Sequence, residues 1–152
     1  MSSVPNRSSV PTEPPSRAAA LAAWAPHALA VLRIVIAYLF LQHGTAKFFG
    51  IPPTPNSGDV ELLSLIGFAA TLEIAGSLLL AIGLFTRLTA FLLCGFMAVA
   101  YFVAHASQGD VLAPIMNGGE LAVVYCFVFL YFVFAGPGAW SIDAALERRR
   151  RR

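Results

Sequence analysis

Glu73 is the residue whose position most strongly suggests chemistry. It lies in the middle of an apolar run from Leu62 to Phe85 that contains no other charged residue. Such a run is long enough to cross a bilayer, and a carboxyl group near the membrane centre costs roughly 2.5–3.5 kcal/mol on insertion scales. We therefore expect Glu73 to face a partner, a cavity or a substrate rather than lipid.

Further polar side chains fall in the outer halves of the expected spans. His43 and Lys47 are four residues apart and project from one helix face. His105 ends the third expected span, and Glu120 begins the fourth. Together they can form one patch that binds an anionic or quinoid head group, with Tyr125 about one and a half turns inside Glu120. The alternative to this patch is that Lys47, His43 and His105 each extend to the outer membrane surface and are solvated separately.

Arg33 is the candidate partner of Glu73. Counted from the helix ends, the two residues differ in depth by one or two turns, and arginine has a long side chain. A pair between them would keep Glu73 ionised. Two roles stay open for Glu73, namely an interhelical brace and a proton carrier.

The composition identifies the protein class that must position these residues. Of the 152 residues, 58% are hydrophobic and 12% charged, against about 25% charged in typical soluble domains. We predict an all-α, polytopic membrane protein: a four-transmembrane-helix bundle with short connections. The expected spans are Ala28–Phe49, Leu62–Gly83, Leu88–Ala106 and Gly119–Ala135.

The charge distribution predicts the orientation and the tails. Nine of the ten basic residues lie near the amino end, in the second connection or at the carboxyl end, which predicts both termini in the cytoplasm. We expect a disordered cytoplasmic tail over 1–25, the membrane domain over 26–138, and a short interfacial helix with a basic tail over 139–152. Ser141 and Asp143 suit the start of that helix. The five terminal arginines favour anionic lipid over nucleic acid.

Few cofactor signals are present. Cys94 and Cys126 form no C-x-x-C pair and are expected to be inert core residues. We identify no haem-attachment motif, nucleotide loop or metal site, although His43 and His105 could in principle ligate haem from two helices. A redox role would therefore use a quinone, or a partner would bring the other groups.

The ordered set of motifs resembles the DoxX family of small four-helix membrane proteins, over nearly all of the chain beyond the amino-terminal tail. The departure is Ala37, where the family often has glycine. The matching residues are Leu32-Arg33, His43-Gly44, Lys47, Glu73, Gly76, Leu80, Gly83, Arg87, Gly118-Gly119-Glu120, Tyr125, Gly136-Pro137-Gly138, Ser141 and Asp143.

The resemblance implies a bundle in the prokaryotic cytoplasmic membrane. Some similar proteins are the quinone-linked subunit of a thiosulfate dehydrogenase, or the membrane partner of soluble enzymes in thiol and superoxide defence. The expected function is accordingly that of the membrane subunit of a quinone-linked oxidoreductase complex. Two alternatives stay open: a non-catalytic scaffold or assembly factor, and a proton or solute carrier that would need homo-oligomers.

Within this expectation, each candidate residue has a role. Protons would be handled by Glu73, His43 and Glu120, and Lys47 would orient the quinone head group. The remaining candidate cofactor-binding residues are His105, Tyr125 and Arg33.

Overall fold

The computed structural model describes residues 16–54, 58 and 60–152, and all regular structure among them is helical. Helix α3 continues directly into a π-helical turn, Tyr101–His105, and a 3₁₀ turn, Ala106–Gln108. The all-α prediction is confirmed over the described residues. The helices are α1 (Arg17–Phe49), α2 (Leu65–Ile82), α3 (Thr86–Ala100), α4 (Glu120–Ala135) and α5 (Ile142–Arg150).

Three helical segments have the length and apolar composition to cross a membrane: α1, α2, and α3 together with its continuation to Gln108. Helix α4 is also apolar but has 16 residues, which give about 24 Å at the usual helical rise. The fourth span therefore stays a prediction. Large apolar side chains are exposed along all four helices, as expected where lipid covers them.

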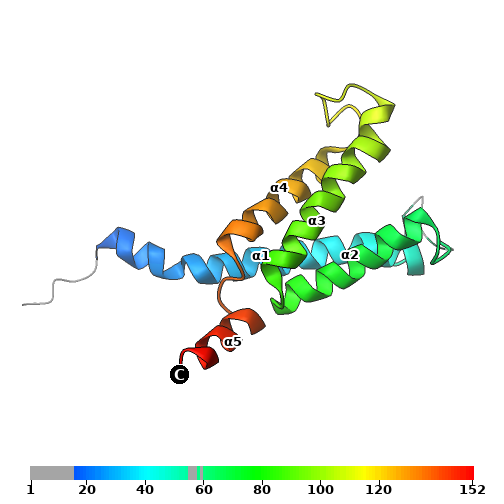
Figure 1. Ribbon diagram of the computed structural model, residues 1–152. Helices are drawn as coiled ribbons and strands as arrows, with labels where there is room; N and C mark the ends of the chain where they lie inside the picture. The colour runs from blue at the N-terminus through cyan, green and yellow to red at the C-terminus, as the bar shows by residue number, and fades with distance from the viewer. Residues whose placement is uncertain (1–15, 55–57, 59) are drawn as a thin grey trace, which may run out of the picture.

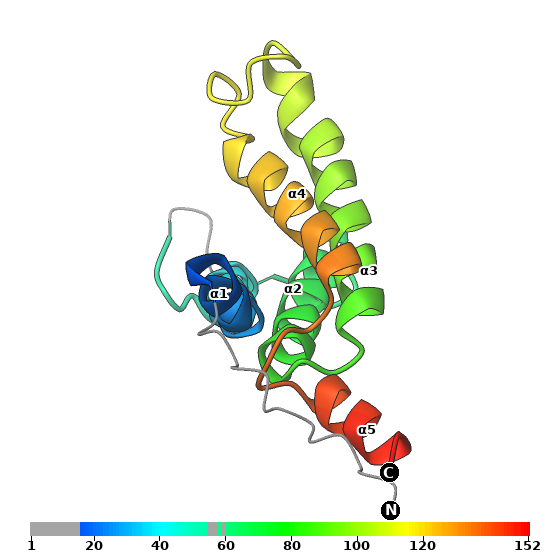
Figure 2. The same cartoon turned by 90° about the vertical axis from the view of Figure 1, so that its left-hand side faces the viewer.

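The four long helices form two antiparallel pairs, α1 with α2 and α3 with α4 (Figure 1). The pairs approach each other at the α2–α3 turn and diverge away from it, as Figure 2 also shows from the side. We call the end with this turn and α5 the turn end. The opposite end, with residues 50–54, 60–64 and 106–119, is the loop end. The arrangement is thus two crossing pairs rather than four near-parallel helices.

Glycines permit the close contacts within and between the pairs. A Cβ on Gly44 of α1 would lie 2.6 Å from Ile74 and 2.9 Å from the carbonyl oxygen of Ala70, both on α2. A Cβ on Gly76 of α2 would lie 2.8 Å from Leu93 of α3. A larger residue at Gly44 would meet the backbone of α2 and push the helices apart, and one at Gly76 would displace the Leu93 side chain, so these glycines permit the observed packing.

The start of α1 corrects the predicted amino-terminal tail. The Ser16 side chain accepts a hydrogen bond from the backbone N–H of Ala19 and caps a helix that begins at Arg17 and continues through Pro26. Residues 17–25, predicted as part of a disordered tail, are therefore helical. The rest of that prediction, residues 1–15, lies outside the described residues.

The segment after α4 returns to the turn end and links the two pairs. Gly136 and Gly138 both have positive φ, and Ser141 caps α5 by accepting from Ala144, as predicted. The Asp143 carboxylate additionally accepts from the first backbone N–H groups of α3, Phe85 and Thr86, at 2.9 and 2.8 Å. An acidic residue at a helix start is favourable, so Asp143 stabilises α3 as well as α5.

Candidate functional site

The centre of the candidate site is an ion pair between Lys47 of α1 and Glu73 of α2. The Lys47 Nζ lies 2.5 Å from the Glu73 Oε1. The Glu73 side chain is 6% exposed and that of Lys47 is 30% exposed, so the carboxylate is enclosed while the ammonium remains near the surface. The pair joins the two helices beside Gly44, where α1 approaches the backbone of α2 closely.

The register of α1 against α2 explains why lysine is the partner. A Cβ on Gly44 would lie 3.1 Å from the Glu73 Cβ, which places Gly44 directly opposite the acid. Lys47 is one turn beyond Gly44 towards the loop end, and its long side chain reaches back to the carboxylate. The alternative, in which Lys47 is solvated separately at the membrane surface, is therefore not observed.

The predicted pair between Arg33 and Glu73 is wrong. Arg33 is fully buried at the turn end, where its Nη2 donates to the carbonyl oxygen of Trp140 at 3.1 Å. At about 1.5 Å of rise per residue, roughly 21 Å of helix α1 separates Arg33 from Lys47. The distance along the helix is too great for the arginine side chain to reach the acid.

Aromatic rings lie on the α4 side of the ion pair. The His43 ring meets the Tyr125 ring edge to face, with centroids 5.8 Å apart, and Phe40 packs against Tyr125 at 5.0 Å. Tyr125 is 5% exposed, whereas His43 lies on an exposed part of α1. The grouping of His43, Lys47, Glu73 and Tyr125 thus combines a buried ion pair with an opening towards lipid, and we call it the Glu73 site.

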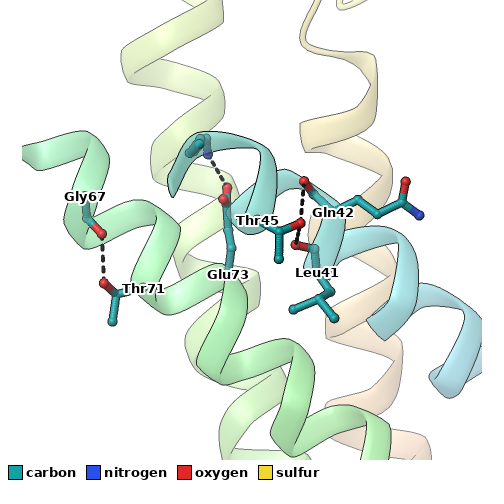
Figure 3. Close-up of polar contacts among 7 residues, drawn as sticks. Leu41, Gln42, Thr45, Gly67, Thr71 and Glu73 are labelled. Atoms are coloured by element: carbon teal, nitrogen blue, oxygen red, sulfur yellow. Dashed lines mark hydrogen bonds and ion pairs between the residues drawn. The ribbon is translucent and has the colours of Figure 1, made fainter. Parts of the chain in front are cut away.

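One carboxylate oxygen of the Glu73 site has no protein partner. The Glu73 Oε2 is buried and accepts no hydrogen bond from the described residues. Nearby hydroxyls do not supply one, because Thr71 donates to the carbonyl of Gly67 at 2.9 Å and Thr45 donates to carbonyls of its own helix (Figure 3). The unpartnered oxygen is therefore available to a ligand, to water or to a proton.

His105 and Glu120 do not join the Glu73 site. The His105 Nδ1 lies 3.3 Å from the Asn117 carbonyl oxygen at the loop end of the α3–α4 pair. Glu120 is exposed in the first turn of α4, where an acid suits the helix dipole. No hydrogen bond or ion pair among the described residues connects either one to His43 or Lys47. The predicted single outer patch is therefore split between the diverging pairs.

Two features of the α3–α4 pair were missed in the sequence. Asn117 is buried and donates to the Tyr101 hydroxyl at 3.2 Å and the Asp110 carbonyl at 3.0 Å, which orders the connection between these helices. An asparagine before two glycines is a turn signal, so its side chain could have been suspected. Cys94 and Cys126 face each other with sulfur atoms 3.7 Å apart, which nothing in their sequence spacing indicates.

Chemically, the Glu73 site offers a cationic donor, an acid with one unpartnered oxygen, an imidazole and a phenol on adjacent helices. These groups can hold an oxygen-rich, lipid-soluble head group and exchange protons with it. The quinone expectation fits this donor set.

The fold and the site define a multi-pass helical membrane protein with an intramembrane ion pair. The DoxX family profile matches residues 28–106, about half of the chain, and the chain belongs to the DoxX family. Similar proteins include an uncharacterized protein of Haemophilus influenzae, 50% identical over 120 residues that cover 78% of this chain and 90% of that protein.

Two relatives from Escherichia coli carry a location in their names. The inner membrane protein YqjF is 30% identical over 123 residues (78% of this chain, 92% of the relative). The inner membrane protein YphA is 26% identical over 130 residues (78% and 89%). With the apolar helices, these relatives identify a multi-pass protein of the prokaryotic cytoplasmic membrane. No solved structure matches the chain.

Proposed function

We propose that this protein is the membrane subunit of a quinone-linked oxidoreductase complex, and that the Glu73 site binds the quinone head group. The observation that carries the proposal is the buried Glu73 carboxylate, which is paired with Lys47 through one oxygen and has no protein partner for the other. A bound quinone would supply two-electron redox chemistry, which no side chain of the site offers.

The residues of the Glu73 site would divide the work of binding and proton transfer. Lys47 and Tyr125 carry donors for the carbonyl oxygens of the head group, and Lys47 stays within reach of both the acid and the surface. Glu73 takes up a proton at its unpartnered oxygen and passes it on, and His43 takes or gives one at the lipid-facing side. The exposed position of His43 favours access from the bilayer.

The proposed topology has four spans, with both termini in the cytoplasm. Helix α4 would be the fourth span, and the basic residues near the termini and the α2–α3 turn support this orientation. The Glu73 site then lies closer to the outer than to the cytoplasmic surface. A fluorescent protein fused after residue 152 would fluoresce only if the carboxyl end is cytoplasmic, and a dark but stable fusion would contradict the proposed orientation.

The close packing of α1 on α2 favours a second candidate, a non-catalytic scaffold for a membrane or redox partner. In that function, the Lys47–Glu73 pair would brace the two helices beside Gly44, and the exposed apolar faces would dock client helices. The two candidates differ in what co-purifies from native membranes. Quinone supports the first, whereas one protein client without any cofactor supports the second.

The quinone proposal is tested by quinone binding and reduction in membranes that carry equal amounts of each variant. Glu73→Gln and His43→Ala should each lower both quantities, because they remove the proton-handling groups. Glu120→Gln should have little effect, since Glu120 lies outside the Glu73 site. Thr71→Val is the matched control on α2, where the hydroxyl bonds only its own helix. Unchanged binding and reduction in Glu73→Gln and His43→Ala would refute the proposed site.

A further inference from the structure

Buried polar atoms without a protein partner gather in one half of the molecule. Over the described residues, every such side-chain atom lies between the depth of Glu73 and the turn end. Such atoms are rare in folded proteins, because an unpaired buried donor or acceptor costs about 1–3 kcal/mol. The atoms are His27 Nδ1, Arg33 Nε and Nη1, Glu73 Oε2, Ser77 Oγ and Thr86 Oγ1.

Four of the residues that carry these atoms are arranged in space from the Glu73 site towards the turn end. In that order they are Glu73, Ser77, Arg33 and Thr86. Glu73 and Ser77 are four residues apart on one face of α2, a helix rise of about 6 Å. Gly83, a further turn and a half along α2, contacts the Arg33 guanidinium, because a Cβ there would overlap the Nη1 atom at 1.8 Å. Thr86 follows directly after the turn.

Ser77 differs from Thr71 and Thr45, two hydroxyl residues near the Glu73 site, in that its hydroxyl has no hydrogen-bond partner among the described residues. A hydroxyl inside a membrane helix commonly bonds the carbonyl one turn earlier, and Thr71 does so with Gly67. Ser77 is 1% exposed and makes no such bond. Its hydroxyl therefore needs another partner, and a water molecule is the usual partner of buried polar groups that the protein leaves unpaired.

The turn end provides a way in for water. A cavity of about 360 Å³ opens there between the start of α3, Pro137 and α5, and its walls include Thr86, Asp143 and Glu147. This cavity has ample room for several water molecules. Thr86 belongs both to the cavity wall and to the set of unpartnered groups. Asp143, also in the wall, donates its backbone N–H to the carbonyl oxygen of Gly83, the residue that contacts the Arg33 guanidinium, so the cavity lies close to that guanidinium.

We propose that a line of internal water runs from this cavity past Thr86, Arg33 and Ser77 to the unpartnered oxygen of Glu73, and that it delivers protons to the Glu73 site. The water line follows from the buried polar atoms alone, whereas the use of its protons rests on the proposed quinone function. Each proton that Glu73 gives to a reduced quinone oxygen is replaced by one that passes along the water line from the turn-end surface. Arg33, as a fixed cation, positions water and carries no proton itself.

The water line is tested by hydroxyl-radical labelling of the full chain in lipid nanodiscs, with radicals made by brief X-ray exposure and the labelled residues found by mass spectrometry. Radicals formed from internal water modify the side chains beside it. Leu80 is fully buried and lies on the same face of α2 as Glu73 and Ser77. We expect Leu80 to be labelled several-fold faster in the unchanged chain than in Ser77→Val, whereas Thr71→Val, whose hydroxyl bonds its own helix, should leave the rate unchanged.

The outcomes separate the water line from the proposed function. Equal, slow labelling of Leu80 in the unchanged chain and in Ser77→Val would overturn the water line. Fast labelling of Leu80 in a protein that neither binds nor reduces quinone would support the water line while refuting the quinone function. For proton delivery, Ser77→Val should slow quinone reduction several-fold with quinone binding unchanged, and Thr71→Val should not. Unchanged reduction in a Ser77→Val protein that has lost the labelling would overturn the proton-delivery role.

Discussion

The two partners of the Lys47–Glu73 pair are enclosed to different degrees, which predicts an asymmetric response to mutation. Lys47→Met leaves an unpaired carboxylate whose side chain is only 6% exposed, whereas Glu73→Gln leaves an unpaired ammonium whose side chain is 30% exposed and lies near the surface. Removing one partner of a buried pair costs about 3–5 kcal/mol, and exposed pairs contribute about 0.2–1 kcal/mol. We therefore expect Lys47→Met to lower the free energy of unfolding by about 2–3 kcal/mol and Glu73→Gln by about 1 kcal/mol.

The measurement is reversible unfolding in mixed micelles, titrated with a denaturing detergent and followed by circular dichroism. The double variant completes the cycle, and it should lose less stability than the sum of the two single variants by about 1 kcal/mol or more, because it leaves no unpaired charge. Thr71→Val on the same helix should change the free energy of unfolding by less than about 0.5 kcal/mol. Additive losses, or a larger loss for Glu73→Gln than for Lys47→Met, would refute the reasoning.

Three further predictions test the helix contacts. Gly83→Ala should destabilise the protein more than Gly118→Ala by about 1–3 kcal/mol in the same unfolding assay, since both glycines have positive φ but only at the first does a Cβ meet a buried guanidinium; equal losses would contradict that contact. Asp143→Asn should cost about 1 kcal/mol by weakening the charged cap on the first turn of α3, seen as faster amide exchange there; unchanged exchange would contradict the cap. Copper phenanthroline should oxidise Cys94 and Cys126 to a disulfide, because their sulfur atoms are 3.7 Å apart. The disulfide is detected as the loss of both maleimide-reactive thiols, with Cys126→Ser as the control. Two thiols that stay reactive would contradict the α3–α4 packing.

The long apolar helices could be predicted because composition and length determine them almost alone. The observed bounds of α2, Leu65–Ile82, differ by a few residues from the predicted span, and Ser64 and Gly83 supply the expected cap residues. The start of α1 was missed, because the capping serine lies in a segment rich in proline and serine that favours disorder.

The partner of Glu73 could not be predicted, because counting residues from each helix end ignores the axial shift between neighbouring helices. That shift depends on the contact of Gly44 with α2 and on the direction in which the Lys47 side chain bends. The same limitation applies to the thiol pair, since sequence separation says nothing about how α3 and α4 are rotated about their axes. The divergence of the two pairs likewise separated His105 and Glu120 from the site to which we assigned them.

The attachment of Asp143 to the start of α3 has a consequence for the order of assembly during synthesis. The contacts that link the pairs at the turn end come from residues 139–143, with Ala139 donating to the Pro26 carbonyl and Asp143 holding the α2–α3 turn. These residues leave the ribosome after all four long helices. Each hairpin can therefore insert and close first, and the hydrogen bonds from 139–143 reinforce the Gly76–Leu93 contact between the hairpins only when the segment after α4 arrives.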